Sequence, residues 1–321
     1  MSSMLPKIPR FYVNELEYLQ TNGYQFNWAQ SDFHPVFRTL PVIPQSINNF
    51  GEVNMGIMTQ VLNLPNTLNN PFIFALGTEA FTFLGNGNGG ILDANNNNIA
   101  IGDTNINICM GAPALDGWSL ITTAEGVDIA SLGIPFGGAL KLGSLVVGSY
   151  WDAPHSVDLN VKMSFDYSGT KKTMTRGGTT LNNTAWTRNP KWGNLPAWEL
   201  KRNAVEVGLS KTGRRIWDIG FSFFTESYLL PTTLNTSTGH GLDDILEDYS
   251  ANTLHNDATD FYSQVITKTL GCGNRPFIFS PDSTSSALDN FAICTFDAKR
   301  FSLNQTSPNL YSTKMRIVET W

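Results

Sequence analysis

Residues 213–223 read Gly213-Arg214-Arg215-Ile216-Trp217-Asp218-Ile219-Gly220-Phe221-Ser222-Phe223. Large apolar side chains at 217, 219, 221 and 223 alternate with Asp, Gly and Ser, which is the period of a half-buried antiparallel strand. The same alternation recurs at Tyr311, Thr313, Met315 and Ile317, separated by Ser312, Lys314 and Arg316. Pro276-Phe277-Ile278-Phe279 is a short apolar strand between turn residues. We predict that both later segments pair with 213–223.

The rest of the chain predicts a mainly β protein in three parts. Residues 1–40, punctuated by prolines, are expected to form an N-terminal arm that runs across another surface. Residues 41–150 contain short apolar runs separated by Gly, Asn and Pro, which favours a jelly-roll β-sandwich. Residues 151–321 are expected to form a second β domain with one helix near 257–270, capped by Asp257 or Thr259 and ended by Gly271.

Composition excludes several classes of function. The formal net charge is −6 and the 21 Lys and Arg are scattered, whereas phosphate binding needs clustered cations, so no nucleic-acid partner is expected. Three cysteines without metal-ligand spacing are expected to be buried thiols, and no metal or other cofactor is predicted. No apolar run reaches the length of a membrane span.

Three segments resemble chemical sites but have simpler interpretations. The acidic run Asp243-Asp244-Ile245-Leu246-Glu247-Asp248 lacks the spacing of a calcium loop and is expected to be a solvated loop or helix start. Asp152-Ala153-Pro154-His155-Ser156 lacks the strained nucleophile turn of a hydrolase, so His155 is expected to form local hydrogen bonds. The glycine-rich stretch 85–90 lacks the Lys-Ser/Thr of a phosphate loop. No catalytic residue is therefore predicted.

Aromatic residues make up 12% of the chain and offer a different functional hypothesis. Exposed rings stack on sugar faces and are enriched in protein interfaces. Trp118 and Trp151 are the candidate glycan-binding residues of this sequence. Core packing is the alternative explanation for both.

Several motifs after Gly148, over about half the chain, resemble a group of virion structural proteins from tailed, largely marine, bacteriophages. They are Asp152-Ala153-Pro154-His155-Ser156-Val157-Asp158-Leu159, Thr175-Arg176-Gly177-Gly178-Thr179-Thr180-Leu181, Ser210-Lys211-Thr212-Gly213-Arg214-Arg215-Ile216-Trp217-Asp218, Phe261-Tyr262-Ser263-Gln264-Val265, Pro276-Phe277-Ile278-Phe279-Ser280-Pro281-Asp282 and Arg316-Ile317-Val318-Glu319-Thr320-Trp321. The order of a Gly-Arg-Arg strand, a helix and a Pro-Phe-Ile-Phe strand is similar to the β domain of distal tail proteins in long-tailed phages.

The resemblance implies a structural role in the virion, with assembly in the host cytoplasm. In distal tail proteins this domain closes into a ring, usually a hexamer, that joins the tail tube to the hub and the adsorption apparatus. Residues 40–150 resemble the galactose-binding-like jelly rolls attached to phage tail proteins. At this place in the sandwich the chain has Leu76-Gly77-Thr78-Glu79, whereas related sandwiches have a Leu-Gly-His-Asn turn. A purely structural role of this unit therefore agrees with the sequence as well as sugar binding does.

The leading hypothesis is a non-enzymatic tail-tip protein that assembles with copies of itself and contacts tube, hub and fibre or receptor-binding proteins. Unpaired sheet edges and aromatic contacts would carry the assembly. Its candidate residues are Arg214, Arg215, Trp217, Phe277 and Trp321, with the two arginines anchoring an intersubunit or strand-end carboxylate. The alternatives are a protein that binds host glycans, capsid decoration and a virion glycoside hydrolase that uses Asp243 or Asp244.

Overall fold

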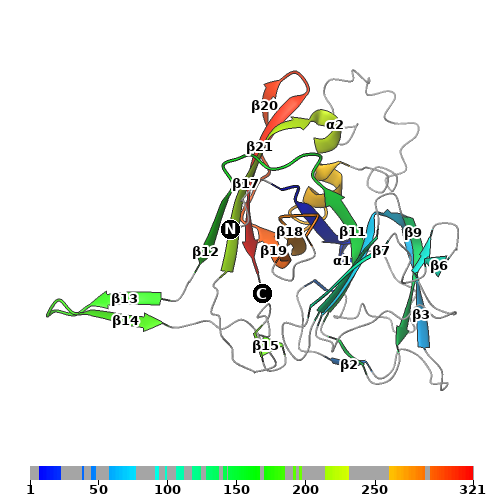
Figure 1. The fold of residues 1–321 in the computed structure, drawn as a ribbon, viewed down its shortest axis with the longest axis horizontal. Helices are drawn as coiled ribbons and strands as arrows, with labels where there is room; N and C mark the ends of the chain where they lie inside the picture. Colours follow the sequence, from blue (N-terminus) through cyan, green and yellow to red (C-terminus); the bar gives the residue numbers. More distant parts are fainter. Residues whose placement is uncertain are drawn as a thin grey trace.

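The protein is an antiparallel β structure with few helices, as the sequence predicts (Figure 1). It was analysed as a computed structural model. The structure describes residues 7–22, 38–39, 45–47, 58–76, 91–93, 98–99, 106–111, 118–123, 128–136, 140–142, 144–166, 170–184, 191–192, 195–196, 214–230, 260–285 and 290–320.

The main body is an eleven-stranded sheet. Ten strands follow one path, and β20 (Asn304–Ser307) pairs with β21 off that path. In spatial order the path is β12 (Lys162–Asp166), β17 (Arg214–Thr225), β21 (Leu310–Glu319), β19 (Ala292–Phe296), β18 (Phe277–Ser280), β1 (Arg10–Asn14), β11 (Ser144–Asp152), β4 (Pro71–Leu76), β8 (Trp118–Thr123) and β7 (Ile106–Gly111).

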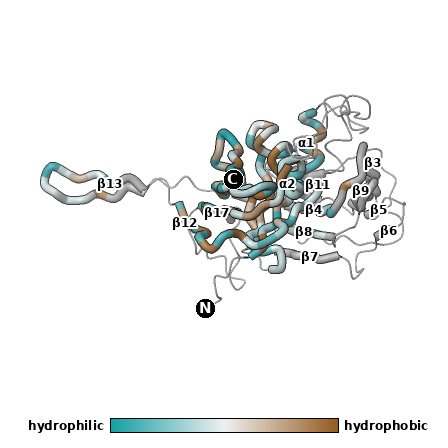
Figure 2. Tube along the Cα trace, turned by 90° about the horizontal axis from the view of Figure 1, so that it is seen from above, coloured by the Kyte–Doolittle hydropathy of each residue, from teal (hydrophilic) through white to brown (hydrophobic). Residues whose placement is uncertain are grey.

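The other described elements are short or peripheral. A four-stranded sheet of order β3-β9-β5-β6 lies beside the part of the main sheet that contains β11, β4, β8 and β7 (Figures 1 and 2). Its strands are β3 (Met58–Asn69), β9 (Asp128–Phe136), β5 (Ile91–Asp93) and β6 (Asn98–Ile99). Three pairs are separate: β2 (Gln45–Ile47) with β10 (Leu140–Leu142), β13 (Thr170–Met174) with β14 (Thr180–Thr184), and β15 (Lys191–Trp192) with β16 (Leu195–Pro196). The helical elements are α1 (Glu15–Thr21), α2 (Glu226–Leu229) and the π-helical turn η3 (Tyr262–Ile266).

The predicted pairing of residues 213–223 is confirmed for one of its two partners. β17 pairs with β21, with Trp217 opposite Ile317 and Ile219 opposite Met315, and all four side chains are buried. The segment 276–279 is indeed a strand, β18, but β21 and β19 separate it from β17. The apolar pattern identifies strands, whereas the choice of neighbour depends on contacts that a single strand does not reveal.

The alternation in β17 breaks at its end, and here the sequence expectation is wrong. Phe221 is fully buried, but Phe223 is 67% exposed and Phe224 takes the inward position. A bulge between Phe221 and Phe224 in the pairing with β21 causes this shift. An extra residue in one strand moves every later side chain to the opposite face of the sheet.

Residues 10–14 do not form an arm over another surface but the central strand β1, between β11 and β18. Phe11 and Val13 pack into one core, and Tyr12 packs into a second core on the other face of the sheet. The neighbouring strands follow the same rule, since Trp151 and Tyr150 of β11 also face opposite cores. A strand buried on both faces is apolar at consecutive positions, which hides its alternation.

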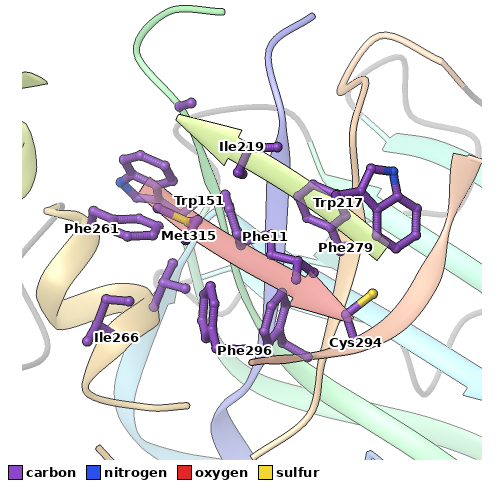
Figure 3. Packing of buried hydrophobic residues seen from close by; sticks show 14 of the residues in the cluster. Phe11, Trp151, Trp217, Ile219, Phe261, Ile266, Phe279, Cys294, Phe296 and Met315 are labelled. Carbon is purple, nitrogen blue, oxygen red and sulfur yellow. The ribbon is translucent and has the colours of Figure 1, made fainter. Parts of the chain in front are cut away.

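The larger core lies between the curved sheet and the helical segment that begins at 260 (Figure 3). Phe261 forms an edge contact with Phe11, with ring centroids 5.4 Å apart, and lies 4.8 Å from the Trp151 ring. After β11, the chain crosses from the β1 side to β17, where the N–H of Asp158 donates to the carbonyl of Gly220. The segment 153–158 therefore joins the two sides of the sheet around this core.

The one helix predicted in the second half lies where expected, near 257–270. Its described part includes the π-helical turn η3, and Asp260 caps it by accepting a 2.8 Å hydrogen bond from the Ser263 N–H. Of the two expected caps, Asp257 and Thr259 both lie outside the described residues. The predicted end at Gly271 is wrong, since the residues with positive φ that end this segment are Gly273 and Asn274.

A buried ion pair attaches α1 to this helical segment. Lys268 Nζ donates to Glu15 Oε2 at 2.7 Å, and both side chains are at most 4% exposed. Gln264 accepts a second hydrogen bond from Lys268, and Arg275 pairs with Glu17. Gly148 of β11 lies beneath the start of α1, where a Cβ would be 1.8 Å from the Val13 carbonyl oxygen. Only glycine permits this close approach of two backbones.

The main sheet runs across the domain boundary that the sequence predicts between residues 150 and 151. That boundary falls inside β11, whose residues on both sides of it pair with β1. β4, β8 and β7 extend the same sheet, whereas β3, β9, β5 and β6 form the separate one. Two β layers thus occur between residues 58 and 136, and the finer jelly-roll assignment stays a prediction.

Candidate assembly surface

β12 is the terminal strand of the main sheet. Its five residues pair with β17, from Lys162 opposite Asp218 to Asp166 opposite Arg214. Among the described strands, none pairs with the other side of β12. An edge of this kind presents unpaired backbone N–H and C=O groups to any added strand.

Apolar side chains mark the same edge. Leu159, Val161, Met163 and Phe165 are 89%, 40%, 43% and 46% exposed, respectively. Alternate positions of an extended chain share one face, so Met163 and Phe165 lie on one side of β12, directly after Leu159 and Val161. We call these four residues the edge stripe. Native proteins usually place charges or proline on an exposed edge, and an apolar stripe there is typical of an interaction site.

The hairpin β13–β14 follows this edge and stands away from the body (Figures 1 and 2). Its strands pair from Thr170 opposite Thr184 to Met174 opposite Thr180. Gly178, with a φ of +82°, closes the turn, and the N–H of Thr179 donates to the Thr175 hydroxyl. Local sequence chemistry thus builds the hairpin without help from the core.

The exposed hairpin also carries apolar side chains. Met174 is 74% exposed and Leu181 is 55% exposed. The sequence from 170 to 184 contains two lysines and one arginine but no acid. An isolated two-stranded hairpin is at best marginally stable in water. A partner that covers Met174 or Leu181 would therefore stabilise the hairpin as well as bind to it.

Of the sequence-predicted assembly residues, Arg215 is engaged within the chain. Its Nη2 and Nε donate to the two carboxylate oxygens of Glu319 at 2.9 and 3.1 Å, and its backbone N–H donates to the same carboxylate. Glu319 is the last residue of β21, so Arg215 meets a carboxylate at a strand end of its own chain. Arg214 begins β17 and is half-buried.

The aromatic candidates lie inside the fold. Trp217 is 3% exposed and packs edge-on against Phe279, with ring centroids 5.3 Å apart. Phe277 is fully buried, 4.6 Å from the Phe296 ring. Neither side chain can reach a neighbouring subunit in this structure. Trp321 lies outside the described residues.

The two glycan-binding candidates have different outcomes. Trp151 is 7% exposed, and Phe11, Phe224 and Phe261 surround its ring. A sugar needs an open ring face, so Trp151 is a core residue and the glycan hypothesis is wrong for it. Trp118 begins β8, but its side chain lies outside the described part of the structure.

Of the three segments that resemble catalytic sites, the structure describes only the one that contains His155. His155 Nδ1 lies 2.8 Å from the Ser156 carbonyl oxygen, which confirms the expected local hydrogen bond, and its Nε2 lies 3.1 Å from the carbonyl oxygen of Phe223, which is distant in sequence. The acidic run 243–248 and the glycine-rich stretch 85–90 lie outside the described residues. No three His, Cys, Asp or Glu side chains gather as metal ligands in the described ranges.

None of the four residues of the edge stripe was among the predicted site residues, because their alternation with polar residues is also the pattern of an ordinary half-buried strand. The structure instead leaves the whole edge stripe exposed, because β12 is at the end of the sheet. Alternation indicates which residues share a face. It does not indicate whether another layer covers that face.

Comparison with protein families, with curated proteins and with solved structures finds no match for this chain. Within the described residues, no helix is long and apolar enough to cross a membrane.

Proposed function

We propose that this chain is a non-enzymatic structural subunit that assembles with copies of itself through β12 and the β13–β14 hairpin. The observation that carries this proposal is the edge stripe: four exposed apolar residues on β12 and in the segment directly before it, where the outer edge of β12 has no described partner. Pairing with a strand of a second copy would satisfy the backbone groups of the edge. It would also bury apolar surface at about 25 cal/mol per Å².

The place of assembly that we propose is the virion of a tailed phage, as a distal tail or tail-tip protein. This part rests on the sequence motifs after Gly148 and on the order of strand, helix and strand that they share with distal tail proteins. A head-to-tail contact between an edge and a projecting hairpin is heterologous, and such contacts generate closed rings when the rotation closes. A ring, with a hexamer as the expected size, would join the tail tube to the hub.

We further propose that residues 41–150 form the jelly roll that projects from this ring as a docking platform. The separate sheet of β3, β9, β5 and β6 supports this arrangement, while β4, β8 and β7 would join the platform to the main sheet. Fibre or receptor-binding proteins are the partners that such a platform would hold. The burial of Trp151 removes one of the two residues that favoured a glycan-binding adhesion protein.

The deciding experiment measures the mass of the purified full chain by native mass spectrometry and by sedimentation over a range of concentrations. We expect the wild type to form a closed oligomer and the Met163→Glu/Phe165→Glu variant to be monomeric. Both side chains are more than 40% exposed, so the variant should keep its fold, which circular dichroism and thermal unfolding would check. A monomeric wild type, or a variant that assembles like the wild type, would contradict the proposal.

The matched control is Tyr228→Glu on α2, which places the same charge at an exposed apolar residue beyond the end of β17 that does not pair with β12. We expect it to assemble like the wild type. A second variant, Met174→Ser/Leu181→Ser, tests the hairpin without disturbing the body. If it lowers the association constant at least tenfold, the hairpin takes part in the contact; an unchanged constant would limit the interface to β12.

A further inference from the structure

A cavity of about 490 Å³ opens beside β17 and β21, at the connection from β19 to β20. Its walls include Lys162 of β12, Lys314 and Arg316 of β21, and Arg300 of the connection. A second hollow of about 510 Å³ shares Arg300 and Lys314 with it and adds Lys299. We call the two together the basic groove.

The charge of the basic groove is opposite in sign to that of the whole chain. Four cations line the first cavity, against the carboxylates of Asp218 and Asp297. Arg316 lies 3.7 Å from Asp218 and 3.5 Å from Asp297, so it offsets part of their charge. In the described part of the chain, no carboxylate lies within ion-pair distance of Lys162, Arg300 or Lys314. These three cations attract an anionic ligand into the groove.

The interior of the groove is apolar. Ile266 and Leu270 of the helical segment, Phe296 of β19 and Phe301 of the connection contribute to its walls. A small inorganic anion would use the cations and leave these side chains uncovered. A ligand that carries both negative charges and apolar side chains would use both parts.

A gap in the sheet lies at the same place. β21 pairs with β19 at 317–319 and with β20 at 310–312, along one and the same edge. The carbonyl of Arg316 on this edge accepts from the Asp297 N–H. Backbone groups of a strand alternate in direction, so those of Lys314, two residues away, point into the same gap. The described strands give them no partner there, and an extended peptide backbone would supply one.

We propose that the basic groove binds an acidic, apolar-containing peptide segment of a partner protein. The acidic side chains would meet Lys162, Arg300 and Lys314, the apolar side chains would contact Phe296 and Phe301, and the backbone would pair with Lys314. The net charge of −6 and the two carboxylates in the groove disfavour a nucleic acid, which needs a continuous cationic surface. This proposal does not depend on ring formation.

The test uses the full chain and a fluorescein-labelled synthetic peptide, Gly-Asn-Glu-Asp-Ile-Leu-Asp-Glu-Asn-Ser, in which four acids flank Ile and Leu. Fluorescence anisotropy measures its affinity. We expect saturable binding that weakens as salt is raised, and at least tenfold weaker binding to Arg300→Glu/Lys314→Glu. Both residues are exposed, and unfolding curves would check that the variant keeps its fold.

The matched control is Lys172→Glu/Arg176→Glu on the hairpin, which reverses two exposed cations elsewhere and should bind the peptide like the wild type. A second peptide with serine in place of Ile and Leu should bind at least fivefold more weakly. Absence of saturable binding, equal loss in both variants, or equal affinity of the serine peptide would overturn the proposal. Inorganic phosphate is then added as a competitor, with chloride at the same ionic strength as its control. If phosphate displaces the peptide and chloride does not, the groove is a simple anion site and the proposal is overturned.

Discussion

Arg215 at the start of β17 and Glu319 at the end of β21 form a two-point ion pair, with Nη2–Oε1 and Nε–Oε2 distances of 2.9 and 3.1 Å. Arg215 Nη2 also donates to the Phe291 carbonyl, and its guanidinium lies 5.3 Å from the Trp217 ring. Glu319 is 3% exposed, so its charge depends on these donors. The pair therefore fixes the ends of two neighbouring strands to each other.

Glu319→Gln is expected to lower the free energy of unfolding by about 3 kcal/mol, because it leaves the Arg215 guanidinium without a buried counter-charge. Urea denaturation measures the change, in the Met163→Glu/Phe165→Glu background so that assembly does not contribute. Arg215→Lys, which keeps the charge but loses the two-point geometry, should show a smaller loss. A change below about 0.5 kcal/mol for Glu319→Gln would mean that the pair is not stabilising.

The bulge in β17 predicts opposite outcomes for two adjacent phenylalanines. Phe224→Ala should lower the free energy of unfolding by about 3 to 5 kcal/mol, because it empties a fully buried site beside Phe221. Phe223→Ala removes the same atoms from an exposed site and should change stability by less than about 0.5 kcal/mol. Equal effects in thermal and urea unfolding would show that the bulge is absent.

The Glu15–Lys268 pair predicts a non-additive result. Lys268→Ala should cost about 3 to 5 kcal/mol, because the Glu15 carboxyl group is then left buried without its partner. The double variant Glu15→Leu/Lys268→Met replaces both charges by apolar side chains and should recover most of that loss. Urea denaturation measures the free energy of unfolding of both variants. A double variant less stable than Lys268→Ala would contradict this prediction.

Tyr18 predicts a loss of stability in alkali. Burial, followed by the nearby Glu15 and Cys272, raises the pKa of its phenol from 10.0 to about 12. Between these values the unfolded chain releases the proton while the folded chain retains it, so the free energy of unfolding falls as pH rises from about 10 to 12. Tyr18→Phe has no proton to release and should show a shallower decline. Urea denaturation at several pH values compares the two slopes, and identical slopes would contradict the assignment.

Local pattern was sufficient for the elements whose two faces differ. β21 alternates between buried Thr313, Met315 and Ile317 and exposed Lys314 and Arg316, as its sequence predicts. The helical segment after residue 260 and the turn at its end also follow local rules of capping and chirality. In these cases the residues that carry the signal lie within a few positions of one another.

The features that define the candidate sites depended on contacts between segments far apart in the chain. The placement of β1 between β11 and β18 joins residues more than 100 positions apart and buries both of its faces. The exposure of the edge stripe follows from the position of β12 at the end of the sheet, and the basic groove collects cations from β12, β21 and the 297–303 connection. Alternation constrains only the relative direction of side chains, whereas burial and charge clustering arise from the neighbours that the completed sheet provides.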